Sequence, residues 1–379
     1  MTPGFNLVGY ATSPTGLGED LRSFAQMLDF LDIPFSVIDI PTDVQGRVPV
    51  SWKSMTTQDY GTTFFFMAAV ECQNLARYQP QLFSVPQKKI GYFLWELPDF
   101  PEDQVPALQL VDHIWCPSRF VQKTIFDKTR QLTLALPLPV LQSPESGRDF
   151  RAELGIPNKA FVALYMFDMR STLKRKNPEG VVAVFEQFLK THSTAHLILK
   201  ISRWEQSGTK ALSWIPKHPK IHVIKETLGQ GDISALYAQA NCYLSLHASE
   251  GFGRTLVEAM HHGLYLVCTN FSGPGDFLNA ENALLVDWER EEVTQKDYPN
   301  LTSKSWWGKP VEKSALKQLK VAFKLSKTGR NTQGIKDSKK FSYETLATKY
   351  LPILKTYFAN WPDQTWTSSL HNLILTNLA

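Results

Sequence analysis

Two glutamates separated by seven residues, Glu250 and Glu258, flank a glycine-containing turn. The run before them, CYLSLH at 242–247, is apolar and rich in strand-forming residues, so it predicts a buried strand. Two glycines after Glu250 predict a loop, and a helical pattern follows that Gly263 can end. The two acids are therefore expected on either side of a strand-to-helix turn.

The spacing of these acids has chemical consequences. On one continuous helix they would lie about 80° apart around the axis and about 12 Å apart along it, which excludes a shared small ligand. Because the glycines interrupt the helix, Glu250 can fold back over the helix N-terminus while Glu258 projects from the second turn. Helix N-termini attract phosphate, whereas carboxylates repel phosphate and bind hydroxyl groups. The combination indicates a sugar joined to a diphosphate; solvated acids at an ordinary turn are the alternative.

The stretch SEGFGRTLVEAM at 249–260 resembles the donor motif of the retaining glycosyltransferases of family 4, which have the GT-B fold. The likeness continues through LYLVCT (264–269), SGPGDF (272–277) and NALLVDW (282–288). The resemblance implies that Glu250 contacts hydroxyls of the transferred sugar and that Glu258 contacts the ribose of the nucleotide. The further donor-binding residues that it implies are Gly251, Phe252, Gly253, Arg254 and Thr255.

A basic segment, MRSTLKRKNPEG at 169–180, follows a predicted strand and enters a predicted helix. Asn177 is expected to cap this helix, with Pro178 at an early helical position. Such charge runs are usually solvated, but this one occupies the first βα loop of the second half, where family 4 has an Arg-Lys pair that binds the diphosphate. Lys176 is the best match to the family lysine and Arg175 the next, and Arg170 matches the other arginine in a register that stays open. Fixed cations there would stabilise the leaving group in the transition state.

In the first half, the loop SPTGLGEDLR at 13–22 follows the first predicted strand. Gly16, Leu17 and Gly18 resemble the first glycine loop of family 4, which faces the donor diphosphate, and the next helix is expected to begin at Gly18 or Glu19. The spacing differs from GxGxxG, which counts against a dinucleotide-binding fold and an NAD dehydrogenase. The alternative is that these glycines only allow an ordinary loop conformation and bind no ligand.

The segment 91–120 resembles a bacterial subgroup that builds envelope polysaccharides, through WELP and IWCPS. Other family 4 members have a His before a Glu at the end of this strand, whereas this chain has Trp95-Glu96. Glu96 is expected to face the donor or the acceptor, with a surface acid as the alternative. His113 and His247 lie at strand ends and are expected to be structural, although His247 adjoins the Glu250 loop.

The order of predicted strands and helices gives an α/β protein of two doubly wound, Rossmann-like domains, with the active site in the cleft between them. The predicted domains are an acceptor-binding domain at 1–145, a donor-binding domain at 146–342, and a C-terminal helix and tail at 343–379 that GT-B enzymes commonly send back to the first domain. The proline-rich segment 137–147 is the predicted linker. After residue 300 the chain becomes more polar and is expected to be helical.

The composition is that of a soluble globular protein. A net charge of +4 over 379 residues does not indicate a nucleic-acid partner. Neither a signal peptide nor a run of roughly 20 apolar residues is evident, and four separated cysteines predict reduced core positions in a cytoplasmic protein. If the acceptor is a lipid-linked glycan, some of the basic residues spread through the first half are expected to contact the inner face of the cytoplasmic membrane: Arg22, Lys53, Arg77, Lys88, Lys89, Arg119, Lys123, Lys128 and Arg130. Ordinary solvated charge is the alternative, because the sequence does not show that these residues share a face.

The predicted activity is metal-independent, retaining transfer of a sugar from a nucleotide-diphosphate sugar to a hydroxyl of a glycan or lipid-linked glycan. No Asp-x-Asp triplet and no zinc-like His/Cys spacing is present, so no metal or other cofactor is expected. The alternatives are a sugar-nucleotide epimerase, a storage-polysaccharide synthase, and a non-catalytic glycan- or nucleotide-binding module.

Overall fold

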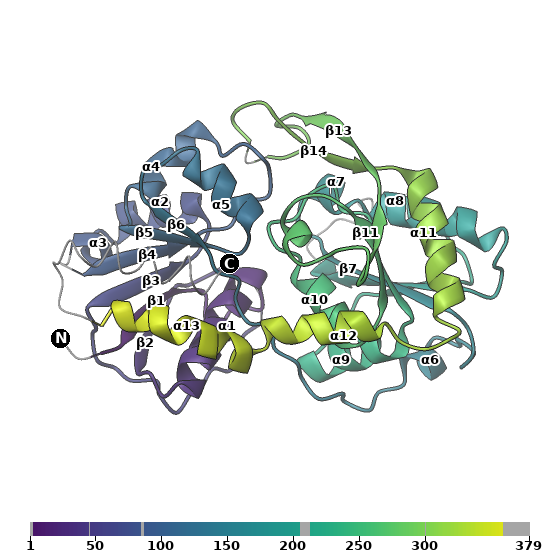
Figure 1. Cartoon of the computed structure of the whole chain (residues 1–379), viewed down its shortest axis with the longest axis horizontal. Coiled ribbons are helices and arrows are strands. Elements are labelled where there is room, and N and C mark those ends of the chain that lie inside the picture. The colour runs from purple at the N-terminus through teal and green to yellow at the C-terminus, as the bar shows by residue number, and fades with distance from the viewer. Residues whose placement is uncertain (1–2, 45, 85–86, 205–212, 300, 359–379) are drawn as a thin grey trace. The chain divides into compact units, whose positions relative to one another are not determined.

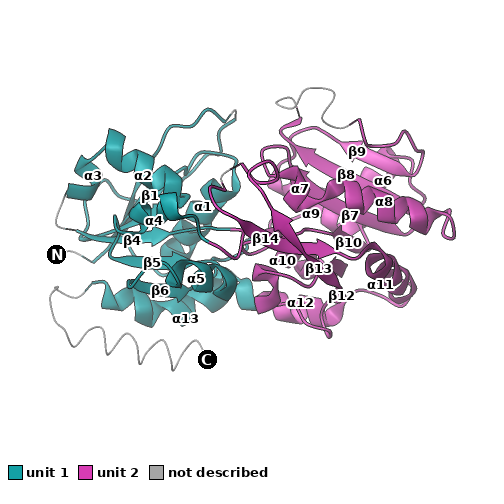
Figure 2. Ribbon diagram, turned by 90° about the horizontal axis from the view of Figure 1, so that it is seen from above, with its two compact units in different colours: residues 1–95, 100–141, 340–379 teal, residues 96–99, 142–339 magenta. Residues whose placement is uncertain are grey.

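The computed structural model describes residues 3–44, 46–84, 87–204, 213–299 and 301–358 (Figure 1). The chain divides into two compact units (Figure 2). Unit 1 comprises residues 1–95, 100–141 and 340–379, and unit 2 comprises 96–99 and 142–339. The end of the predicted segment 343–379, from residue 359 with Trp361 and Trp366, lies outside the described residues.

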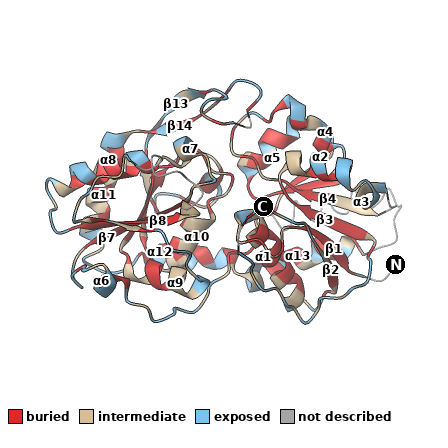
Figure 3. Cartoon of the chain, turned by 180° about the vertical axis from the view of Figure 1, so that it is seen from behind, coloured by how far each residue is buried: buried red, intermediate tan, exposed pale blue. Residues whose placement is uncertain are grey.

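Unit 1 contains, in its described residues, a six-stranded parallel sheet in the order β2-β1-β3-β4-β5-β6. Its strands are β1 (Phe5–Gly9), β2 (Phe35–Asp39), β3 (Thr62–Phe66), β4 (Lys88–Tyr92), β5 (His113–Cys116) and β6 (Leu132–Ala135). β1 and β3 are buried at every position, as expected for parallel strands covered on both faces (Figure 3). The sheet is therefore of the doubly wound type that the alternating pattern predicts.

Helices cover the sheet of unit 1 and complete its core. They are α1 (Gly16–Phe30), α2 (Ala69–Tyr78), α3 (Gln81–Ser84), α4 (Val105–Leu108), α5 (Arg119–Phe126) and α13 (Tyr343–Thr356), with 3₁₀ turns at η1 (Glu102–Gln104) and η5 (Lys339–Phe341). α13 packs against α1, although the two are far apart in sequence (Figure 1). Tyr350 of α13 donates a hydrogen bond to the carbonyl oxygen of Pro137 at 2.7 Å, so the last described helix is part of the core of unit 1.

Unit 2 contains, over its described part, a second six-stranded parallel sheet in the order β12-β11-β10-β7-β8-β9. Its strands are β7 (Val162–Asp168), β8 (His196–Ser202), β9 (Ile221–Ile224), β10 (Cys242–Ser245), β11 (Tyr265–Thr269) and β12 (Leu284–Val286). The central strands β7 and β10 carry the site segments at their carboxyl ends, which is where ligands bind in open parallel sheets.

The remaining elements of unit 2 are helices and one hairpin. The helices are α6 (Phe150–Glu153), α7 (Leu173–Lys176), α8 (Pro178–Leu189), α9 (Gln230–Gln239), α10 (Arg254–His261), α11 (Glu312–Leu325) and α12 (Thr332–Ser338), with η4 (Gly273–Asp276). β13 (Trp288–Val293) and β14 (Ser305–Pro310) form an antiparallel hairpin. The expectation of purely helical structure after residue 300 is wrong at β14, because cross-strand pairing with β13 overrides the local pattern.

Candidate functional site

The chain breaks between β10 and α10, and Glu250 lies in that break. Gly253 has a φ of 95°, a left-handed conformation in which an added Cβ would lie 2.9 Å from Leu256 Cδ1. α10 then runs from Arg254 to His261, and Gly263 follows with a φ of 67°. Glu258 therefore lies in the second turn of the helix and Glu250 outside it, which confirms the predicted break.

A second loop fixes the backbone of Glu250. The Glu250 N–H donates to Ser272 Oγ at 2.8 Å, and the Gly273 N–H donates to the Glu250 carbonyl oxygen at 2.9 Å. A Cβ at Gly273 would overlap the carbonyl group of Gly251, so only glycine permits this close approach. The two glycine-containing loops therefore form one rigid support for the Glu250 side chain.

A hydrogen bond connects the basic segment between β7 and α8 to the end of β10. Asn177 adopts a left-handed conformation with φ 51°, and its side chain accepts from the Gly180 N–H at 3.1 Å. This confirms Asn177 as the cap of α8 with Pro178 at its first turn. Asn177 Nδ2 also donates to the Leu246 carbonyl at 2.9 Å, which brings the preceding residues Arg175 and Lys176 to the end of β10.

Four charged side chains of unit 2 meet there, and we call them the acid–base cluster: Glu96, Arg175, Lys176 and Glu250. Lys176 Nζ lies 2.5 Å from Glu250 Oε1, and Arg175 Nη1 lies 3.1 Å from Glu250 Oε2. Arg175 Nη2 lies 2.7 Å from Glu96 Oε1. The side chain of Arg175 is only 3% exposed and that of Glu250 12%, whereas that of Lys176 is 19% exposed.

The cluster fixes the charge of Glu250. Burial alone would raise the pKa of Glu250, but the positive charges of Lys176 and Arg175 outweigh it and lower the pKa from 4.5 to about 2. Burial would lower the pKa of Arg175, but the charges of Glu96 and Glu250 raise it above its ordinary value. Glu250 and Arg175 are therefore ionised near neutral pH, and Glu250 accepts hydrogen bonds there without donating any.

Arg170 lies apart from the cluster, at the end of β7. It is exposed, and its backbone N–H donates to Asp168 Oδ1 at 2.9 Å. The Asp168 carboxylate also accepts from Arg203 Nε at 2.9 Å. Of the three basic residues predicted from this segment, the structure brings Arg175 and Lys176 to Glu250 and leaves Arg170 at the surface.

Glu258 has a different neighbour. Tyr237 of α9 donates a hydrogen bond from its hydroxyl to Glu258 Oε2 at 2.8 Å. Burial raises the pKa of Tyr237 well above its ordinary value, and the charge of Glu258 adds to this rise. Glu258 is partly exposed beside Arg254 and Thr255 on the first turns of α10, and its contact with a ribose stays a prediction.

The first glycine loop belongs to unit 1. α1 begins at Gly16, two or three residues before the predicted start at Gly18 or Glu19, because Thr15 caps it by accepting from the Gly18 N–H at 3.2 Å. A Cβ at Gly18 would overlap carbonyl oxygens of Tyr10 and Ser13, whereas the space at Gly16 is open. Gly18, not Gly16, is thus the residue that the loop conformation requires, and the role of Gly16, Leu17 and Gly18 in donor binding stays a prediction.

Glu96 lies four residues beyond the end of β4, not at the strand end that the sequence predicts. The strand ends at Tyr92, and residues 96–99 belong to unit 2. The Tyr298 hydroxyl donates to Glu96 Oε2 at 2.9 Å. Tyr298 was not predicted as a site residue, since it lies between two strands that the sequence does not predict.

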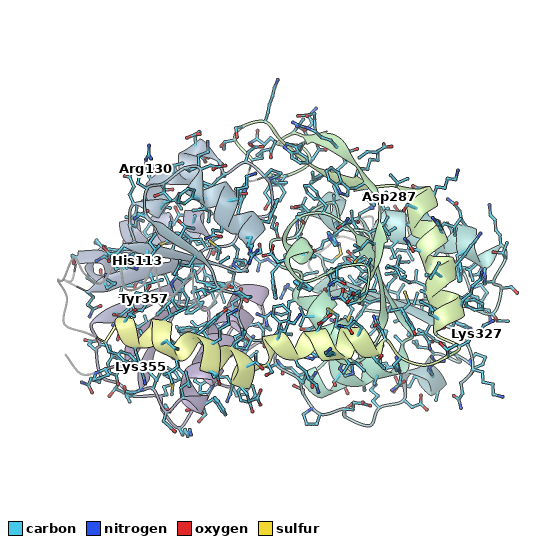
Figure 4. All side chains as sticks on the ribbon, viewed as in Figure 1. His113, Arg130, Asp287, Lys327, Lys355 and Tyr357 are labelled. Carbon is cyan, nitrogen blue, oxygen red and sulfur yellow. The ribbon has the colours of Figure 1, made fainter. Side chains whose placement is uncertain are left out.

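The two histidines are buried. His113 Nδ1 lies 3.1 Å from the hydroxyl of Tyr357, next to the end of α13, and burial lowers the pKa of His113 to about 4 (Figure 4). Burial also lowers the pKa of His247 to about 4, with the cations Lys176 and Arg175 lowering it and Glu250 opposing them. His247 Nδ1 lies 3.1 Å from Ser245 Oγ. Both rings are therefore neutral near pH 7, and their structural role stays a prediction.

The described residues contain no group of three or more His, Cys, Asp or Glu side chains arranged to bind a metal ion. None of the described helices is long and apolar enough to cross a membrane. The four cysteines are buried and free, as expected.

Sequence comparison places a family match on unit 2. Residues 147–296 match the model of the family described as glycosyl transferases group 1, and this span includes Arg175, Lys176, Glu250 and Glu258. No curated protein matches the chain in sequence.

Solved structures resemble the whole chain. A glycosyltransferase from Rickettsia africae ESF-5 has a TM-score of 0.63 at 12% identity, covering 95% of this chain and 100% of that one. HepE from Anabaena, in complex with UDP-glucose, has a TM-score of 0.64 at 14% identity, covering 93% and 100%. Sucrose-phosphate synthase from Thermosynechococcus elongatus has a TM-score of 0.68 at 13% identity, covering 94% and 99%.

The chain has the GT-B fold. Its two six-stranded parallel sheets are the two Rossmann-like domains of that fold, as predicted from the sequence. At these identities the likeness establishes the fold, and activity has to be argued from the site.

Proposed function

We propose that the chain is a metal-independent, retaining glycosyltransferase of family 4. It would transfer a sugar from a nucleotide-diphosphate sugar to a hydroxyl of a growing glycan. The observation that carries this proposal is the Lys176–Glu250 pair at the end of β10, with Lys176 partly exposed and Glu250 held ionised. The family match over residues 147–296 and the structural likeness to HepE, which was solved with UDP-glucose, support it.

Each residue of the site has a role in this proposal. Glu250 accepts hydrogen bonds from hydroxyls of the transferred sugar, and Glu258 accepts from the ribose. Lys176, with Arg170 and the N-terminus of α10, neutralises the diphosphate as the glycosidic bond breaks. The acceptor hydroxyl attacks from the face that the diphosphate leaves, and the departing phosphate oxygen takes its proton, so no protein nucleophile is needed.

We further propose that the acceptor is a lipid-linked glycan of an envelope polysaccharide and that the enzyme works on the cytoplasmic face of a membrane. In support, Arg119, Lys123 and Phe126 share the exposed face of α5, and the Phe126 side chain is 59% exposed. We call these three residues the α5 stripe. Cations flanking an exposed aromatic ring suit an anionic lipid surface. Arg22 does not contribute, because it is buried and its Nη1 donates to the carbonyl oxygens of Ala11 and Ser13 at 2.8 and 2.7 Å.

The test starts from binding. Purified protein is screened by thermal shift against UDP, GDP, dTDP and their sugars, and nucleotide release from the best donor is then measured with and without glycan acceptors. The expected result is release that requires an acceptor, with the donor's anomeric configuration kept in the product by NMR. Glu250→Gln serves as the matched variant that keeps the shape and loses the charge.

Other outcomes decide against the proposal. Conversion of the donor sugar without any acceptor would indicate an epimerase. Transfer to a glucan primer alone would indicate a storage-polysaccharide synthase. Nucleotide binding with no turnover of any donor would indicate a binding module.

A further inference from the structure

Arg175 is enclosed by protein groups on both sides of its guanidinium. Nη1 donates to the Ser249 carbonyl oxygen at 2.7 Å and lies 3.1 Å from Glu250 Oε2. Nη2 lies 2.7 Å from Glu96 Oε1. A guanidinium has five N–H donors in a fixed fork, and these contacts occupy both terminal nitrogens. Nε is buried and has no hydrogen-bond partner among the described residues. The Arg175 side chain is only 3% exposed, so a phosphate oxygen could reach it only if the protein groups around it moved.

Tyr298 fixes Glu96 from the other side. Its hydroxyl donates to Glu96 Oε2 at 2.9 Å, and Tyr298 itself is 6% exposed in the segment between β13 and β14. Tyr298, Glu96, Arg175 and Glu250 therefore form one continuous chain of charge-assisted hydrogen bonds within unit 2. We call it the Tyr298–Glu250 chain.

We propose that Arg175 is a positioning residue for Glu250, held in place by Glu96 and Tyr298, and that it does not bind the donor diphosphate. This inference rests on the proposed function, in which Glu250 binds the sugar. One cation contacts each Glu250 oxygen, Lys176 at Oε1 and Arg175 at Oε2, so the plane of the carboxylate is fixed. Its remaining lone pairs then point in set directions toward the sugar hydroxyls, and a misplacement of about 1 Å costs on the order of 10²-fold in rate.

A second ion pair links the same two segments and provides the control. Lys174 of α7 lies 2.5 Å from Asp297, the residue before Tyr298, but the Lys174 side chain is 62% exposed. If the Tyr298–Glu250 chain merely fastened the segments together, loss of the Lys174–Asp297 pair would have a similar effect on activity. If it positions Glu250, Asp297→Asn should leave the sugar-transfer parameters unchanged.

The main experiment compares nucleotide binding with sugar transfer in Arg175→Lys, Tyr298→Phe and Asp297→Asn. The probe is the nucleoside diphosphate among UDP, GDP and dTDP that stabilises the wild type most, together with its sugar. We expect the Kd of the diphosphate to stay within about twofold in all three. The kcat/KM for the sugar donor should fall about 10²-fold in Arg175→Lys, which cannot keep both contacts, and on the order of tenfold in Tyr298→Phe.

The outcome that overturns the inference is a Kd that rises in Arg175→Lys by as much as kcat/KM falls, since Arg175 would then bind the diphosphate. A loss in Asp297→Asn equal to that in Tyr298→Phe would also overturn it. Tyr298→Phe removes only a hydroxyl, and melting curves of all variants identify any loss that is due to unfolding. An Arg175→Lys protein that does not fold leaves Tyr298→Phe to decide the question.

The pH dependence of kcat/KM distinguishes positioning of Glu250 by Arg175 from a purely structural role, which would leave that pH dependence unchanged. The charged and titratable groups around Glu250 are Lys176 and Arg175 from α7, His247 after β10, Tyr165 and Tyr243 from β7 and β10, and Tyr298 between β13 and β14. Arg175→Gln should move the acid limb of kcat/KM to higher pH, because Glu250 loses one of its two cations, while Asp297→Asn should leave the limb in place. A limb unchanged in Arg175→Gln would contradict the inference.

Nucleotide binding and turnover by the wild-type protein distinguish failure of this inference from failure of the proposed function. If the wild-type protein binds no nucleoside diphosphate and turns over no sugar nucleotide, the proposed function fails and the inference fails with it. If the wild type is active, the Arg175 and Tyr298 variants judge the inference alone.

Discussion

Replacing Lys176 by Met tests the proposed charge assignment most directly. The substitution removes the ammonium that lies 2.5 Å from Glu250 Oε1 and keeps most of the aliphatic side chain. Because negative charge on the diphosphate grows as the glycosidic bond breaks, we expect kcat to fall by on the order of 10²–10³-fold, the usual cost of losing one electrostatic contact to a developing charge. The Kd of the nucleoside diphosphate should rise by a smaller factor.

The structure also gives a magnitude for the effect on Glu250. The lowering of its pKa from 4.5 to about 2 corresponds to roughly 3 kcal/mol of net stabilisation of the carboxylate. Burial works against this stabilisation, so the cations contribute more than the net amount, and the charge of Lys176 is the largest favourable cause. The pKa of Glu250 should therefore rise in Lys176→Met, even though Arg175 remains.

The sign of the pH dependence follows from the direction of the shift. A carboxylate whose folded pKa is lowered stabilises the fold fully above its unfolded pKa near 4.5, and this stabilisation is lost as pH falls toward about 2. Denaturant unfolding at several pH values between 5 and 2 should show a smaller acid-induced loss of stability in Lys176→Met than in the wild type.

The prediction is tested by steady-state kinetics, by calorimetry with the nucleoside diphosphate, and by denaturant unfolding between pH 5 and 2. Lys176→Arg is the matched control, because it keeps the charge and should recover part of the turnover. The reasoning would be refuted by a Lys176→Met enzyme whose kcat lies within about threefold of the wild type while Glu250→Gln is inactive.

Two further predictions concern the proposed activity, and two concern unit 1. Glu258→Ala should weaken nucleotide binding by roughly 1.5–3 kcal/mol, since a ribose hydroxyl loses a charged acceptor, and unchanged affinity in calorimetry would remove Glu258 from the site. Activity should be retained in EDTA. Loss of activity in the chelator that is restored by Mn²⁺ would contradict metal independence. Gly18→Ala should destabilise unit 1 by about 1–3 kcal/mol in thermal melts because its Cβ overlaps backbone carbonyls, whereas Gly16→Ala, in open space, should not. The protein should sediment with vesicles only when they contain anionic lipid, and this binding should weaken as salt is added. It should also weaken when Arg119 and Lys123 of the α5 stripe are replaced by Ser, but not in Lys53→Ser. Absence of binding to both anionic and neutral vesicles would exclude membrane contact.

Local chemistry explains the part of the site that could be predicted. The left-handed Gly253, the end of α10 at Gly263 and the Asn177 cap each depend on a few neighbouring residues, whose preferences are readable from the chain alone. The apolar periodicity of the strands likewise predicted both parallel sheets. The start of α1 was misplaced because Thr15 was not recognised as its cap.

Long-range pairing explains what could not be predicted. β13 has the sequence WEREEV, in which four of six residues are charged, and this disfavours a strand when the segment is taken alone. Its strand conformation depends on β14, where Trp307 Nε1 donates to Glu291 Oε2 at 2.7 Å and Lys309 pairs with the same glutamate. Tyr298, which lies between these strands, could therefore not be connected to Glu96 from the sequence.

The pair Arg175–Lys176 shows how one turn of helix separates two roles that look alike in sequence. Consecutive helical residues point about 100° apart, so in α7 the Arg175 side chain is 3% exposed while the Lys176 side chain is 19% exposed. The planar guanidinium suits an enclosed position between two carboxylates, and the compact ammonium suits a position where one partner is protein and the other side remains accessible. A phosphate at Arg175 would be a third anion beside Glu96 and Glu250 in a nearly fully buried place, and repulsion among the anions disfavours it. The two neighbouring cations should for this reason respond differently to substitution: loss of Lys176 should weaken both diphosphate binding and turnover, and Arg175→Lys should weaken turnover alone.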